Sequence, residues 1–138
     1  MVLAHWTIGQ LEEIEEKALR RLEVYQTREQ QAYKEYGRES RELDAAEANL
    51  RWLVLKEQHL RSEDVVGLEE YTDIVRNRLI AADAVDRLKK KVAHAEKEIH
   101  RYAEHVKIQQ ELAEQAYYER IGRIRSLSVY QGRLRPLP

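Results

Sequence analysis

The chain has 138 residues, no cysteine and a formal net charge of −1, and 36% of its residues are charged. Only five glycines and two prolines interrupt it. This composition is typical of long helices, and it excludes disulfides and thiol chemistry. The near-neutral charge gives no overall attraction to nucleic acid or anionic membranes. No apolar run reaches the roughly 18 residues of a membrane span, and the opening MVLAHWTIGQ does not resemble a signal peptide. We therefore expect a soluble, cytoplasmic chain.

A heptad repeat predicts the first helix, over about residues 8–60. Ten of thirteen positions, taken four and three residues apart in turn, are apolar or tyrosine, which indicates one buried seam in a left-handed supercoil. The positions are Ala18, Leu22, Tyr25, Glu29, Ala32, Tyr36, Glu39, Leu43, Ala46, Leu50, Leu53, Glu57 and Leu60.

A connecting tip is predicted over about residues 61–69, within the segment RSEDVVGLEE at residues 61–70. Ser62 followed by two acids suits a helix N-cap, so the second helix begins either there or after a looser loop that ends near Glu69. Gly67 is the strong helix breaker nearby. A short connection makes neighbouring helices antiparallel.

A second heptad stripe predicts a helix over about residues 70–127, with twelve of fourteen positions apolar or tyrosine. Near its end the apolar spacing changes, which predicts a stutter through Ala113, Tyr117, Ile121 and Ile124. Residues 128–138 contain a glycine and two prolines and are expected to form a flexible basic tail. The stripe is Tyr71, Ile74, Arg78, Ala81, Val85, Leu88, Val92, Ala95, Ile99, Tyr102, Val106, Gln109, Ala113 and Ala116.

The predicted fold is all-α, a single long two-helix antiparallel coiled-coil hairpin over residues 1–138. The alternative is one continuous helix that pairs with another chain. Alanine fills much of the seam, and polar residues interrupt it, so the seam is regular but weakly filled. These polar residues either fix the register or allow the hairpin to bend or repack on a partner. They are Glu29, Glu39, Glu57, Arg78 and Gln109.

Catalytic, metal and cofactor sites are not expected. The five histidines, at 5, 59, 94, 100 and 105, include no pair four residues apart, and the glycines are isolated. The carboxylates alternate with Lys and Arg on faces where ordinary surface ion pairs form. We therefore expect no enzyme activity and no cofactor.

Two outward-facing groups are candidates for partner binding. Trp52 and Leu55 lie three residues apart outside the seam, and Ile80 also lies outside it. Such residues serve either local packing near the tip or docking of a partner. A second apolar group, near the two helix ends, either closes the hairpin or binds a partner. It comprises Trp6, Ile8, Tyr117, Tyr118, Ile121 and Ile124.

The first helix starts acidic and the chain ends basic, and in an antiparallel hairpin these two regions lie at the same end. Four acids, at 12, 13, 15 and 16, open the first helix, and no acid follows Glu119. The arginines at the basic end either neutralise these acids or, with Tyr118, bind an acidic partner. Nucleic-acid binding is less favoured because the basic footprint is small. The arginines are Arg120, Arg123, Arg125, Arg133 and Arg135.

The segment LKEQHLRSEDVVGLEEYTDIVRNRLI resembles the FliJ/YscO-like central-stalk family of flagellar and type III secretion export. AYY, at residues 116–118, is similar to a C-terminal end in that family. The acidic opening LEEIEEK departs from the family's basic start. The matching positions are Leu60, Ser62, Glu63, Asp64, Val65, Leu68, Ile74, Val75 and Arg76.

The resemblance implies a cytoplasmic, non-enzymatic stalk or adaptor of a bacterial protein-export machine, associated peripherally with the inner-membrane apparatus. Its expected partners are the export ATPase, contacted by the end that bears the termini, and the export gate or escort chaperones. The acidic opening puts that ATPase contact in question. A stalk is expected to be a monomer or a weak oligomer. The alternative is a structural spacer or an oligomeric scaffold of viral or cytoskeletal type.

Overall fold

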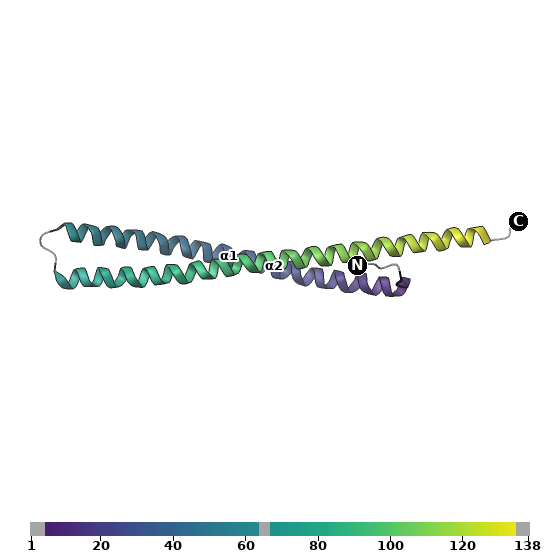
Figure 1. Cartoon of the computed structure of the whole chain (residues 1–138), viewed down its shortest axis with the longest axis horizontal. Helices are drawn as coiled ribbons and strands as arrows, with labels where there is room; N and C mark the ends of the chain where they lie inside the picture. The colour runs from purple at the N-terminus through teal and green to yellow at the C-terminus, as the bar shows by residue number, and fades with distance from the viewer. Residues whose placement is uncertain (1–4, 64–66, 135–138) are drawn as a thin grey trace. The chain divides into compact units, whose positions relative to one another are not determined.

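The chain folds into two long α-helices that pack against each other, with α1 at Ile8–Ser62 and α2 at Leu68–Leu134 (Figure 1). The computed structural model describes residues 5–63 and 67–134, and the side chains of this part up to residue 127. The described residues contain no strand. The predicted all-α helical hairpin is confirmed.

Interhelical packing divides the chain into two units. The terminal unit comprises Met1–Glu29 and His100–Pro138, and the middle unit comprises Gln30–Ile99. In the terminal unit Glu15 pairs with Arg120, and in the middle unit Glu57 pairs with Arg78. Each unit is therefore a pair of helix segments that run antiparallel, joined by contacts between residues distant in sequence.

A capping box starts α1 at the predicted residue. Thr7 Oγ1 accepts a hydrogen bond of 3.1 Å from the backbone N–H of Gln10, and Gln10 Oε1 accepts one of 2.9 Å from the backbone N–H of Thr7. This reciprocal pair satisfies donors that a helix start leaves without partners. Trp6 and Leu11 occupy the two positions that a hydrophobic staple uses. The cap fixes the start of α1 beside the buried Leu11.

The interpretation of Ser62 as the N-cap of the second helix is wrong. Ser62 is the last residue of α1, and its hydroxyl donates a 2.7 Å hydrogen bond to the carbonyl of His59. The second helix begins at Leu68, where the carbonyl of Gly67 accepts from the N–H of Tyr71 at 3.1 Å. Glycine serves as an N-cap, and the acids at 69 and 70 favour the first turn. The looser-loop alternative is therefore correct.

Every position of the two predicted heptad stripes is buried or half-buried. The register was thus predicted correctly along both helices. The seam contains small residues, as expected: alanines 18, 32, 81, 95, 113 and 116 belong to the buried core. In the middle unit Leu53, Leu60, Ile74 and Ala81 form one apolar cluster. Among the described side chains of the terminal unit, the cluster comprises Leu11 and Ala116, with Ile14 against it. This cluster is smaller than that of the middle unit.

The predicted stutter is absent. Tyr117 and Ile124 are exposed and Ile121 is half-buried, whereas Ala116 is buried and Arg120 and Arg123 are half-buried. These last three continue the heptad spacing beyond Ala113, so the supercoil register does not change there. The prediction failed because it followed apolar residues, while the seam at Arg120 is filled by an arginine whose charge is paired across the interface.

The predicted tail boundary at residue 128 is also wrong, since α2 continues to Leu134. A single glycine, Gly132, costs a helix only about 1 kcal/mol, which does not stop it. Proline lacks a backbone donor and disfavours a helical conformation in the residue before it, and the first proline in the sequence is at position 136. Residues 135–138 of the predicted tail lie outside the described residues.

Candidate protein-interaction surfaces

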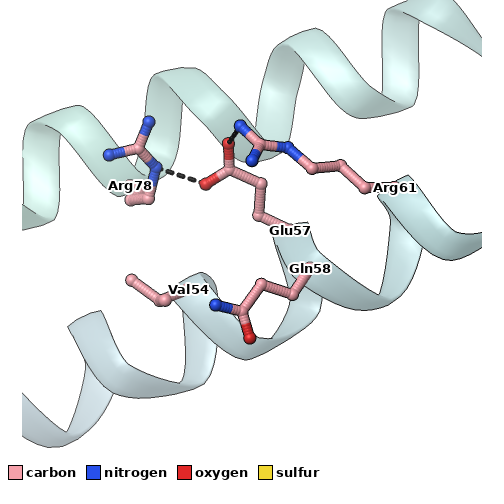
Figure 2. A pocket seen from close by; sticks show the side chains of 5 residues that line it. All are labelled: Val54, Glu57, Gln58, Arg61 and Arg78. Atoms are coloured by element: carbon pink, nitrogen blue, oxygen red, sulfur yellow. Dashed lines mark hydrogen bonds and ion pairs between the residues drawn. The ribbon is translucent and has the colours of Figure 1, made fainter.

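An ionic layer crosses the seam of the middle unit (Figure 2). Glu57 is only 5% exposed, and its two carboxylate oxygens bind different arginines. Arg78 of α2 approaches one oxygen through Nε, and Arg61 of α1 donates from Nη2 to the other at 3.0 Å. A buried carboxylate requires such partners, because desolvation alone penalises its charge by several kcal/mol. The layer therefore selects the register that brings Glu57 opposite Arg78.

Tyr71 completes this layer. Its hydroxyl accepts a 2.8 Å hydrogen bond from Nε of Arg61. This hydrogen bond, supported by the Glu57 carboxylate, raises the pKa of the Arg61 guanidinium above its ordinary value. Beside the layer lies an open pocket of about 260 Å³, lined by Val54, Gln58 and the three charged residues. Figure 2 shows Gln58 pointing away from the ion pairs. The charged groups here bind one another, which indicates a structural role.

A second ion pair occupies the seam of the terminal unit. Glu15 Oε2 accepts from Nε and Nη2 of Arg120 at 3.1 and 2.9 Å. Both side chains are about one-fifth exposed. The interpretation that the basic end neutralises the acidic start is thus correct for Arg120. Its guanidinium also lies 5.6 Å from the centre of the Tyr117 ring, and the pair fixes the register of this unit.

One seam group of the terminal unit remains without a hydrogen-bond partner. Gln109 is buried, and its Oε1 has no such partner among the described residues. An unsatisfied buried acceptor costs about 1–3 kcal/mol. Nearby along the seam, the rings of Tyr25 and His105 stack at 4.7 Å with an interplanar angle of 12°. The terminal unit therefore combines a small apolar cluster with polar seam contacts.

The predicted outer apolar residues are exposed. Trp52, Leu55 and Ile80 are 56%, 64% and 59% exposed. The ammonium of Lys56 lies 4.9 Å from the centre of the Trp52 ring, within the range of a cation–π contact. All three residues belong to the middle unit. More than half of each residue stays accessible to a partner, while Lys56 packs locally on Trp52. Their role in binding a partner stays a prediction.

The other candidates lie in the last described turns of α2. Tyr118 is 70% exposed and contacts the Tyr117 ring edge-to-face at 5.4 Å. Arg123 lies 3.5 Å from the Glu119 carboxylate, and Arg125 is exposed. Since Arg120 is engaged with Glu15, the structure does not present these three arginines as one basic surface. The apolar closing group predicted here has other members: the buried contact is between Leu11 and Ala116.

Sequence reasoning missed a groove in the terminal unit. Its volume is about 160 Å³. It is lined by Trp6, Ile14, Lys17, Ala18, Arg21 and Leu112. Two signals were present: Ile14 and Leu112 are bulky apolar residues that flank the heptad seam on the same side, and Trp6 precedes the cap. We call this the terminal groove.

The part of the chain that the structure describes contains no group of three or more His, Asp or Glu side chains that could hold a metal ion. Within it, neither helix is apolar enough over a sufficient length to cross a membrane. No protein-family model, curated protein or solved structure matches the chain.

Proposed function

We propose that the chain is a non-catalytic stalk or adaptor that works by binding other proteins, on the cytoplasmic side of a bacterial type III export apparatus. It links the export ATPase to the export gate or to chaperones. The observation that carries the binding role is the exposed group Trp52, Leu55 and Ile80 on a helix pair of fixed register. The machine is inferred from the resemblance around the tip.

The physical argument concerns what this exposed group gains from a partner. Tryptophan is enriched among the residues that dominate binding energy at protein interfaces, because it removes a large apolar area from water when it is covered. Leu55, one turn away on the same helix, extends that area. The ionic layer at Glu57 lies within the same stretch of α1 and holds α1 against α2. The group is therefore presented on a preorganised surface, which lowers the entropic cost of association.

The test uses the whole chain and the purified export-gate protein and escort chaperones encoded in the same genome. We expect a monomer by light scattering at micromolar concentration, and binding of one of these partners by sedimentation velocity. The double variant Trp52→Ala/Leu55→Ala is expected to lose affinity for the partner by roughly tenfold or more, because it lacks an aromatic anchor. The control is Tyr33→Ala, which removes another exposed aromatic side chain from α1 of the same unit. Equal binding by the two variants would refute the role of this surface.

A scaffold that self-associates is the second candidate. It is favoured by the presence of exposed apolar residues on both helices of the middle unit, at Trp52 and Ile80. A scaffold is expected to form oligomers at micromolar concentration, and Trp52→Ala is expected to return it to a monomer. A chain that stays monomeric across this concentration range rules the scaffold out.

A further inference from the structure

The terminal groove has the size of one bulky apolar side chain. Its volume is about 160 Å³, and its apolar lining comes from Trp6, Ile14 and Leu112. A cavity of about 150 Å³ with aliphatic and aromatic walls holds a benzene ring. Leucine, isoleucine or phenylalanine from another segment therefore fits this space. Trp6 is 39% exposed and gains burial when the groove is filled.

Two cations, Lys17 and Arg21, stand one helical turn apart along the groove. Both are exposed. Glu13 pairs with Lys17 at 2.9 Å, and this contact lowers the pKa of the Glu13 carboxyl. The residues that line the groove include no acidic side chain. The apolar floor is thus bordered by positive charge contributed by α1.

On α1 of this unit, charge is segregated between the two sides of the seam. By heptad position, Lys17, Arg21 and Arg28 of α1 fall on the side of the groove. The opposite side of the same helix carries acids at the corresponding outer positions. They are Glu12, Glu16 and Glu23. On α2, Glu119 lies on the groove side, where Arg123 binds it at 3.5 Å, and Lys107 lies on the other side. The α1 charges therefore favour a negatively charged segment on the groove side, which gives the groove a preferred partner chemistry.

We propose that the terminal groove binds an acidic amphipathic helix of a partner protein. One apolar side chain of that helix fills the groove, and two of its carboxylates, one turn apart, face Lys17 and Arg21. A helix matches the site because its residues at i and i+4 have the same spacing as the two cations. The proposal rests on the adaptor function above and states the partner chemistry of its terminal unit.

A second copy of the chain is a less suitable occupant. Leu19 is half exposed on α1 and has Glu16 and Glu23 one turn away on either side. Docking of this face into the groove of another copy joins two different surfaces and need not close into a defined oligomer. We therefore assign the groove to another protein.

The experiment uses tryptophan fluorescence of the whole chain. The protein has two tryptophans, so Trp52→Phe leaves Trp6, in the groove lining, as the single reporter. The probes are two synthetic amphipathic helical peptides with one leucine stripe, one with glutamate and one with lysine at the flanking positions. We expect saturable quenching or a blue shift of the Trp6 emission with the glutamate peptide, weakened by added salt.

Arg21→Glu is the diagnostic variant, because it places like charge against the peptide; we expect binding roughly tenfold weaker. Lys107→Glu is the matched control, because it makes the same charge change at an exposed position on the opposite side of the seam of this unit. We expect the control to bind as the Trp52→Phe parent does. Circular dichroism checks that both variants keep the parent's helix content.

Three results would overturn the proposal. The glutamate peptide leaves the Trp6 emission unchanged, the lysine peptide binds equally well, or Lys107→Glu weakens binding as much as Arg21→Glu. Concentration-dependent self-association that Arg21→Glu and Leu19→Ser both abolish would assign the groove to a second copy instead. None of these results changes binding of the export gate or chaperones through Trp52 and Leu55, so the failure of the two proposals is distinguishable.

Discussion

Replacement of Glu57 by glutamine tests whether the ionic layer holds the middle unit in register. The Glu57 side chain is 6% exposed, that of Arg78 is 30% exposed and that of Arg61 is 62% exposed. Removal of one partner from a fully buried ion pair costs about 3–5 kcal/mol. Arg78 retains access to water, and glutamine still accepts one hydrogen bond, so the expected cost is smaller. We expect Glu57→Gln to lower the free energy of unfolding by about 2 kcal/mol.

Urea unfolding followed by circular dichroism measures this difference in the free energy of unfolding. An unchanged slope of that free energy against urea concentration indicates that the folded state is the same. Arg78→Gln and the double variant complete a thermodynamic cycle, in which we expect a coupling energy of about 1 kcal/mol or more. Glu39→Gln is the control, because Glu39 is a half-buried seam carboxylate of the same unit. If the double variant loses as much stability as the two single variants do together, the two residues are not coupled and the ionic layer does not hold the register.

The charged residues of the terminal unit give two further predictions. Arg120→Ala is expected to lower the free energy of unfolding by about 1–2 kcal/mol, because it leaves the partly buried Glu15 without its guanidinium partner. The control Arg125→Ala is expected to change the free energy of unfolding by less than about 0.5 kcal/mol. Equal effects of the two variants in urea unfolding would contradict the assignment of Arg120 to the seam. Glu13 has a lowered pKa in the folded chain because Lys17 binds it, so its contribution to stability is present above the unfolded glutamate pKa of about 4.3 and is lost as the pH falls through the folded value. An NMR titration of the Glu13 side chain is expected to show this lowered pKa, and Lys17→Met is expected to return it to the ordinary range.

The seam was predictable because its residues repeat with the period of a supercoiled helix. Tyr25, Glu57 and Gln109 were assigned to it correctly despite their polarity, since their position in the repeat outweighs their chemistry. The same repeat predicted that Trp52, Leu55 and Ile80 face outward. These assignments depend only on local periodicity, which can be read from a single sequence.

The errors arose where one residue's chemistry was given more weight than its context. Ser62 suits an N-cap, but as the last residue of α1 it instead donates to a carbonyl of that helix. Neutralisation of the acidic start by the basic end was one of the predicted alternatives, but Glu15 could not be named as the partner of Arg120 because the two are distant in sequence. The terminal groove forms where Ile14 of α1 and Leu112 of α2 lie together across the interface, and this pairing of distant residues could not be predicted from the sequence.

The two seam ion pairs also govern which changes of length this hairpin tolerates. Glu15 and Glu57 lie 42 residues apart, as do Arg78 and Arg120, so six whole heptads separate the pairs in each helix. If seven residues between the two ion pairs are deleted from one helix alone, one of the two glutamates is shifted by a heptad and no longer lies opposite its arginine. Matched deletions of seven in both helices preserve both pairs. Descendants of this chain are therefore expected to shorten or lengthen by paired heptads, and insertions in a single helix to be selected against.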